Sequence, residues 1–203
     1  MNLEFLTLSL LVVASPGTGA AVTIATGLAR GTRTALVAAF GCTLGIVPHM
    51  LAAVTGLAAL LHASALAFEA VKVAGVAYLL YIAWMTWHEK GVLEVKADSA
   101  ERTDCQVIRH AVLVNLLNPK LSVFFLAFLP QFVARNEPAP TLAMLELSAI
   151  FMAMTFAVFA VYGAFAARMR DRVLGSPAAM VWLRRSFAAT FVALGAKLAL
   201  STR

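Results

Sequence analysis

Apolar residues dominate six long segments of the chain, which are separated by shorter polar or small-residue stretches. The segments cover residues 4–28, 34–61, 66–87, 110–133, 141–166 and 181–200. An α-helix needs ~20 apolar residues to cross the hydrocarbon core of a bilayer, and each segment is long enough. The pattern therefore predicts an all-α polytopic membrane protein with six transmembrane helices, forming a single membrane domain over residues 1–203.

One polar stretch divides these spans into two halves of three. Residues 89–109 are rich in Asp, Glu, Lys and Arg, so we expect an exposed cytoplasmic loop there, between a first half at 1–88 and a second half at 110–203. Because each half has an odd number of spans, the two halves must have opposite orientations. The expected architecture is an inverted 3+3 repeat.

A proline interrupts the first helix of each half. Pro16 and Pro119 are 103 residues apart and occupy matching positions in their halves. Proline has no N–H to donate one turn back, and a carbonyl left without a donor in hydrocarbon needs another partner. Paired interruptions in two halves are typical of a transporter's binding site. We therefore expect helices 1 and 4 to be broken and to meet near the middle of the membrane.

The first break provides candidate substrate-binding residues at Ser15, Pro16, Gly17 and Thr18. Ser15 and Thr18 carry hydroxyl groups, and the free N–H groups of the half-helix that follows place a positive dipole end near an anion such as an amino-acid carboxylate. The alternative is a simple kink, since proline and glycine are tolerated in transmembrane helices.

The second break adds Asn115, Asn118, Pro119 and Lys120 as candidate substrate-binding residues. The two asparagines are three residues apart, so they share a helical face, and each amide offers donors and an acceptor. Hydrogen bonding between helices is the alternative role for them. Lys120 could neutralise a carboxylate, or its long stem could carry the ammonium group to the cytoplasmic interface.

The second span carries two further features. Gly41 and Gly45 form a GxxxG pair, which predicts close helix packing, either within the chain or between two copies in a homodimer. His49 follows on the same face. A histidine titrates near neutral pH, so His49 is a candidate for proton coupling, with a hydrogen-bonded structural role as the alternative.

Composition excludes several classes of protein. The 203 residues are 62% hydrophobic and 13% charged, and the mean hydropathy is +0.87. The net charge of +6 does not indicate nucleic-acid binding, because no basic run is interleaved with aromatic residues. Walker, GxGxxG and HExxH motifs and ligand-spaced Cys/His sets are lacking, so we expect neither an enzyme nor a cofactor or metal site.

The basic residues also predict an orientation. Most of the 16 Lys and Arg residues lie in the loops around 29–33, 88–109 and 168–185. The positive-inside rule makes these loops cytoplasmic and places both termini outside the cell membrane. Since the N-terminus has no basic region before its long apolar run, we expect a retained first span rather than a cleaved leader.

Several motifs resemble the LysE/RhtB family of amino-acid exporters, and within it the homoserine/threonine branch. They are Ser-Pro-Gly-x-Gly at Ser15–Gly19, the glycine-rich second span through His49, AFEAVKVAGVAYLLYIAW at Ala67–Trp84, and AVLVNLLNPKLSVFFLAFLPQF at Ala111–Phe132. Many members have proline where this chain has Thr18. The resemblance implies a bacterial inner-membrane transporter that exports amino acids in exchange for protons. Homoserine, homoserine lactone and threonine are the leading substrates.

Two other functions stay open at this point. Distant relatives suggest export of another solute such as a divalent metal cation, although the spans hold no cluster of metal ligands. A membrane scaffold that transports nothing would not need a proton dependence. An intramembrane enzyme ranks below both, because no nucleophile and base form a convincing pair.

Overall fold

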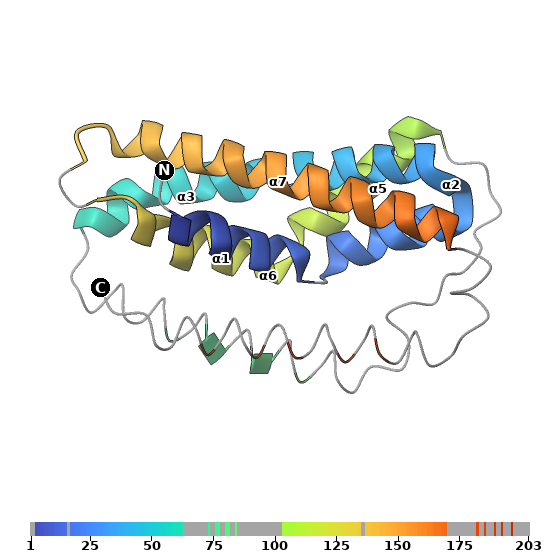
Figure 1. Cartoon of the computed structure of the whole chain (residues 1–203). Helices are drawn as coiled ribbons and strands as arrows, with labels where there is room; N and C mark the ends of the chain where they lie inside the picture. Colours follow the sequence, from blue (N-terminus) through green and yellow to red (C-terminus); the bar gives the residue numbers. More distant parts are fainter. Residues whose placement is uncertain are drawn as a thin grey trace.

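The computed structural model describes residues 3–15, 17–62, 103–134 and 137–169, and in addition positions 73, 76, 77, 80, 81, 84, 182, 185, 189, 192 and 196. The regular structure of this part is helical throughout (Figure 1), in agreement with the all-α prediction. The spans expected at 66–87 and 181–200 fall mostly outside the described residues. Pro16 also lies outside them.

The first two predicted spans are joined by a tight reversal. Helix α1 covers Leu3–Ala14, and α2 covers Thr18–Leu44. Within α2 the chain turns back at Gly31, whose φ of 82° favours glycine. The Cys42 thiol lies 3.6 Å from the carbonyl oxygen of Gly19. In a straight helix those residues would be ~34 Å apart, so α2 is an antiparallel hairpin.

The second predicted span contains a turn that we did not expect. This span consists of the second arm of α2 and of α3 (Val47–His62), and the turn between them is formed by Gly45 and Ile46. Pro48 explains the interruption, because it cannot donate to the carbonyl group of Leu44, four residues earlier. The turn places His49 in the first turn of α3, where it is buried.

The fourth predicted span is broken where the sequence indicated. Helix α5 (Asp104–Leu116) ends before Asn118, and α6 (Pro119–Val123) starts with proline as its first residue. A π-helical turn, η1 (Phe124–Phe128), and a 3-10 turn, η2 (Leu129–Phe132), complete the span. The two parts, Asp104–Leu116 and Lys120–Phe132, are bent by 55°.

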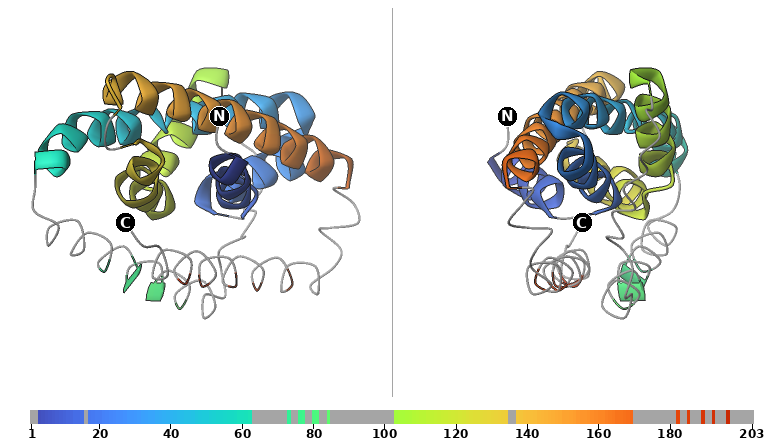
Figure 2. Two further views of the ribbon diagram at one scale, coloured as in Figure 1. Left: turned by 60° about the vertical axis from the view of Figure 1, so that its left-hand side comes forward. Right: turned by 90° about the vertical axis from the view of Figure 1, so that its right-hand side faces the viewer.

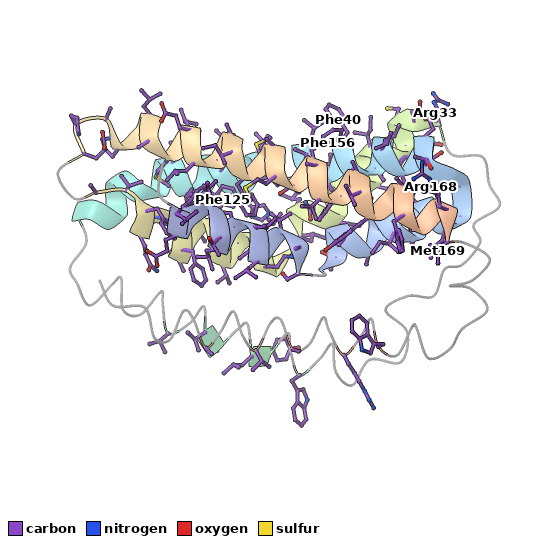
Figure 3. The ribbon with its side chains drawn as sticks, viewed as in Figure 1. Arg33, Phe40, Phe125, Phe156, Arg168 and Met169 are labelled. Atoms are coloured by element: carbon purple, nitrogen blue, oxygen red, sulfur yellow. The ribbon has the colours of Figure 1, made fainter. Side chains whose placement is uncertain are left out.

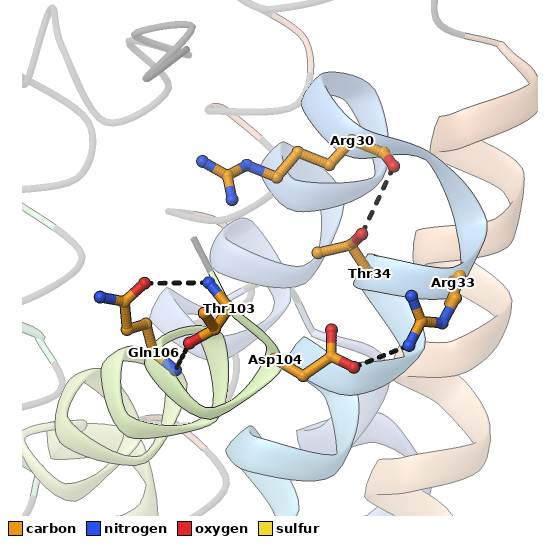
Figure 4. Close-up of polar contacts among 6 residues, drawn as sticks. All are labelled: Arg30, Arg33, Thr34, Thr103, Asp104 and Gln106. Atoms are coloured by element: carbon orange, nitrogen blue, oxygen red, sulfur yellow. Dashed lines mark hydrogen bonds and ion pairs between the residues drawn. The ribbon is translucent and has the colours of Figure 1, made fainter. Parts of the chain in front are cut away.

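The start of α5 corrects the expected loop boundary at residue 109. The helix begins at Asp104, because Thr103 and Gln106 form a capping box (Figure 4). The Thr103 N–H donates to Gln106 Oε1 at 2.9 Å, and the Gln106 N–H donates to Thr103 Oγ1 at 3.4 Å. Asp104 pairs with Arg33 at 2.8 Å, which joins this end of α5 to the α2 turn.

Helix α7 (Pro140–Arg168) lies along one side of the α2 hairpin, and α5 lies on the other (Figure 2). Helix α7 is long and apolar enough to cross a membrane. The same holds for the 39-residue stretch Thr18–Gly56, which the reversal folds into two legs, and for the bent pair α5 and α6–η2 taken as one span.

Aromatic side chains show which surfaces are inside and outside. Phe124 stacks on Phe151 with ring centroids 4.3 Å apart, and Phe125 packs edge-on against Phe151. Phe40 and Phe156 instead point outward (Figure 3) and are 48% and 39% exposed. Outward apolar side chains suit a helix surrounded by lipid tails.

Candidate functional site

Each helix break frees one particular carbonyl group. An α-helical N–H donates to the carbonyl four residues earlier, so a proline at position i deprives residue i−4 of its donor. Pro16 therefore frees the carbonyl of Val12, and Pro119 frees that of Asn115. In both cases a side chain from the opposite half of the chain contacts this carbonyl oxygen, at 2.9 Å for Val12 and 3.1 Å for Asn115.

The Val12 carbonyl receives a hydrogen bond from Lys120. The Lys120 Nζ lies 2.9 Å from Val12 O, 2.7 Å from Ser15 O and 3.3 Å from Ser15 Oγ. Lys120 is only 3% exposed, so its ammonium group turns inward and does not reach an interface. The C-terminal end of a helix carries partial negative charge, and α1 ends at this point, so its dipole favours a cation here.

The space around this ammonium group depends on Gly17. A Cβ added to Gly17 would lie 3.0 Å from Lys120 Nζ and 3.2 Å from Cε. Gly17 is buried and has extended backbone at the N-cap of α2, where no side chain caps the helix. The neighbouring Thr18 is exposed, which separates it from the other predicted residues of this break.

The Asn115 carbonyl receives hydrogen bonds from the His49 ring and from a neighbouring backbone N–H group. His49 Nε2 lies 3.1 Å from Asn115 O, and the Asn118 N–H donates to the same oxygen at 3.1 Å. A carbonyl oxygen only accepts, so His49 must carry a proton on Nε2. His49 Nδ1 faces the Ser122 hydroxyl at 3.4 Å, and a hydroxyl can either donate or accept.

The two asparagine amides link the breaks to the rest of the bundle. Asn118 Nδ2 donates to Asn115 Oδ1 at 2.9 Å, and Asn118 Oδ1 caps α6 by accepting from the Lys120 N–H at 3.1 Å. Asn115 Nδ2 donates to the carbonyl of Cys42 on α2 at 2.6 Å. Both side chains are buried, with 1% and 3% exposure. The amides therefore hold α5, α6 and α2 in a fixed register.

Close backbone contacts allow this register. An added Cβ at Gly41 would lie 2.8 Å from Ala111 Cβ, and one at Gly45 would lie 2.8 Å from Asn115 Cβ. The GxxxG face of α2 is thus occupied by α5 of the same chain, which leaves it unavailable to a second copy. Gly19 is equally close, because its Cβ would lie 2.6 Å from Asn115 Oδ1.

Several residues of the site were not predicted. The Tyr162 hydroxyl on α7 donates to the carbonyl of Ala14 at 2.6 Å, and so caps another C-terminal group of α1. Val12 and Ser122 were missed as well. Counting four residues back from Pro16 would have found Val12, whereas no local pattern indicates Tyr162 or Ser122.

Of the predicted site residues, the structure thus brings together Ser15, Gly17, His49, Asn115, Asn118 and Lys120, while Pro119 forms the start of α6. Such a site combines a buried ammonium group, two amides and the backbone groups of two helix ends, and these are kinds of group that can bind a small zwitterion. Within the described ranges, no group of three or more His, Cys, Asp and Glu residues could hold a metal ion.

The chain is similar to known proteins over nearly its whole length. Residues 10–202 match the family described as LysE type translocator. The chain is 32% identical to a homoserine/homoserine lactone efflux protein of Salmonella typhimurium, over 96% of this chain and 94% of the relative. It is 32% identical to a membrane protein of Vibrio cholerae serotype O1, over 97% and 95% of the two chains.

A more distant relative is a leucine efflux protein of Klebsiella pneumoniae, 24% identical over 76% of this chain and 73% of that protein. No solved structure is significantly similar. The family match covers nearly the whole chain, and efflux proteins recur among the relatives. The chain therefore belongs to the LysE/RhtB family of amino-acid efflux transporters, which are membrane proteins and not enzymes.

Proposed function

We propose that this transporter exports homoserine, homoserine lactone and threonine from the cytoplasm in exchange for protons. The observation that carries the proposal is the buried meeting of two helix breaks, in which Lys120 of the second half bonds to Val12 and Ser15 of the first. The Salmonella relative is named for homoserine and its lactone. The more distant relative, named for leucine, also supports a neutral amino acid as the substrate.

The proposed architecture is six spans in an inverted 3+3 repeat, with helices 1 and 4 broken. It is supported by the reversal at Gly31 and by the breaks at residues 15–17 and 117–118. In such a repeat, we expect each half to contribute a side chain to the helix break of the other half. Lys120 donates to the first break, and His49 lies against the carbonyl freed in the second.

The orientation that we propose places the loops around 29–33, 88–109 and 168–185 in the cytoplasm and both termini outside the inner membrane of a bacterium. Arg33 and Arg168 lie at the same end of the molecule (Figure 3), and Asp104 at the start of α5 pairs with Arg33 there. Described basic residues of two of these loops therefore lie at one end, together with the start of α5, and by the positive-inside rule this supports a cytoplasmic face there.

The proposed substrate-binding residues line the two breaks: Ser15, Pro16, Gly17, Thr18, Asn115, Asn118, Pro119 and Lys120. His49 is the proposed proton-coupling residue. Its Nδ1 faces the Ser122 hydroxyl, which can donate to a neutral imidazole or accept from a protonated one. A proton can thus be gained or lost at Nδ1 without breaking the bond between Nε2 and Asn115 O.

The test is uptake of labelled homoserine and threonine into inside-out membrane vesicles with an acidic interior. Proton-coupled export predicts accumulation that disappears when the gradient is collapsed and that is absent from vesicles without the protein. Uptake that is equally fast with and without the pH gradient would contradict proton exchange. Uptake of a divalent metal cation in place of amino acids would favour that other solute, and no uptake of any solute would favour a scaffold.

A further inference from the structure

The end of α1 forms a small cage of oxygen atoms around the Lys120 ammonium group. We define the cage as Val12 O, Ser15 O and Ser15 Oγ, which lie 2.9, 2.7 and 3.3 Å from Nζ. Val12 and Ser15 are 0% and 5% exposed, and Lys120 is 3% exposed. The cage is therefore a built, buried site for one small cationic group.

All three oxygens of the cage must accept. Val12 O and Ser15 O are carbonyl oxygens, which have no proton to give. The Ser15 hydroxyl donates its own proton to Val12 O at 2.5 Å, so its oxygen accepts from Lys120. Three acceptors match the three N–H donors of an ammonium group, and the negative end of the α1 dipole favours its positive charge.

This pairing limits how a zwitterion can bind. Every N–H of Lys120 is already used, so a carboxylate can contact this side chain only if at least one cage bond breaks. The vacated cage then needs another donor, because a buried acceptor without one is costly. An amino acid carries such a donor in its own ammonium group, with the same charge and the same three N–H bonds.

We propose that the cage binds the ammonium group of the substrate, and that the ammonium group of Lys120 occupies the cage while no substrate is bound. The inference rests on the proposed function and specifies how that site recognises its substrate. When an amino acid enters, its ammonium group replaces Nζ in the cage, and the displaced lysine pairs with the carboxylate. For an amino acid the exchange keeps each charge paired, whereas homoserine lactone offers the displaced lysine only its ester oxygens. Both kinds of substrate need a primary ammonium group.

Chemical rescue tests the cage without any transport measurement. Lys120→Ala removes Cγ, Cδ, Cε and Nζ, which propylammonium replaces atom for atom. Propylammonium at ten times its Kd should raise the Tm of Lys120→Ala by about 3 °C or more and leave the wild type unchanged. Tetramethylammonium, which has the charge but no N–H, is the control. An equal rise with tetramethylammonium, or no rise with propylammonium, would overturn the proposal.

A ligand series on the wild-type protein covers the case in which Lys120→Ala does not fold. N-acetylhomoserine keeps the carboxylate and loses the ammonium group, and homoserine lactone keeps the ammonium group and loses the carboxylate. Calorimetric titration should show N-acetylhomoserine binding at least about tenfold more weakly than both homoserine and the lactone. Equal binding of N-acetylhomoserine and homoserine would refute the ammonium cage.

These experiments separate the two proposals. If rescue fails in protein whose wild type accumulates homoserine, the cage is wrong and the proposed function stands. If rescue succeeds but the wild type binds none of homoserine, its lactone and threonine, the proposed function is wrong. The assignment of the cage to the substrate is then wrong with it, although the cage itself accepts an ammonium group.

Discussion

A substitution at Gly45 should reveal whether close packing of α2 against α5 holds the candidate site together. A Cβ at this position would lie 2.8 Å from Asn115 Cβ and 3.0 Å from the carbonyl oxygen of Val112. Carbon atoms prefer separations of ~3.5–4.0 Å, so α5 must move away by ~1 Å. Gly45 has φ −63° and ψ −9°, which alanine adopts readily, so packing alone opposes the change.

We expect Gly45→Ala to lower the free energy of unfolding by ~1–3 kcal/mol, the usual cost of overpacking. For a chain of this size that corresponds to a Tm lower by ~2–12 °C. Movement of Asn115 should also weaken its bond to the Cys42 carbonyl, which is 2.6 Å long, and so reduce export. The assay is thermal unfolding in detergent together with homoserine uptake in vesicles.

Gly56→Ala is the matched control, because a Cβ at Gly56 would have nothing within 4 Å. Alanine is favoured over glycine within a helix by ~1 kcal/mol, so this variant should be as stable as the wild type or more so. If Gly45→Ala and Gly56→Ala have the same Tm and the same export rate, the close contact between α2 and α5 does not constrain the site.

Four further substitutions test individual contacts. Ser9→Ala should leave the free energy of unfolding unchanged or raise it by up to ~1–3 kcal/mol, because Ser9 Oγ is buried without a hydrogen-bond partner in the described part of the chain. A lower Tm for this variant in thermal unfolding would contradict the prediction. Tyr162→Phe should cost ~1 kcal/mol by freeing the Ala14 carbonyl, and an unchanged Tm would contradict that bond. Thr103→Ala should lower the free energy of unfolding by ~0.5–2 kcal/mol, because it removes the capping box. Arg33→Gln should lower it by less, because the Arg33 side chain is 85% exposed. A lower Tm for Arg33→Gln than for Thr103→Ala would refute the reasoning.

Local chemistry allowed the helix breaks to be predicted, because proline removes a donor wherever it stands in a helix. The breaks beside Pro16 and Pro119 and the reversal at Gly31 all lie where the sequence indicated. The interruption before Pro48 follows the same rule but was missed, since the apolar run continues through it. The early start of α5 was missed because charged residues suggested a loop, although Thr103 and Gln106 have the spacing of a capping box.

The partners of the freed carbonyls could not be predicted in the same way. Lys120 reaches Val12 across 108 residues of chain, and His49 reaches Asn115 across 66. Such contacts depend on how the spans pack, which the periodicity of one segment does not specify. For Lys120, both interpretations considered from sequence kept the ammonium group available, to a substrate or to the interface. The structure instead shows all of its donors used within the protein.

Export by variants of the second break tests the central claim that the joined breaks bind the substrate. Asn118→Ala and Lys120→Ala each remove buried polar contacts at the breaks, and Thr55→Ala on the exposed part of α3 is the control. At equal amounts of inserted protein, we predict that both site variants accumulate homoserine at least about tenfold more slowly than the wild type, a loss of ~1.4 kcal/mol or more, while Thr55→Ala matches it. Wild-type rates in Asn118→Ala and Lys120→Ala would contradict the claim.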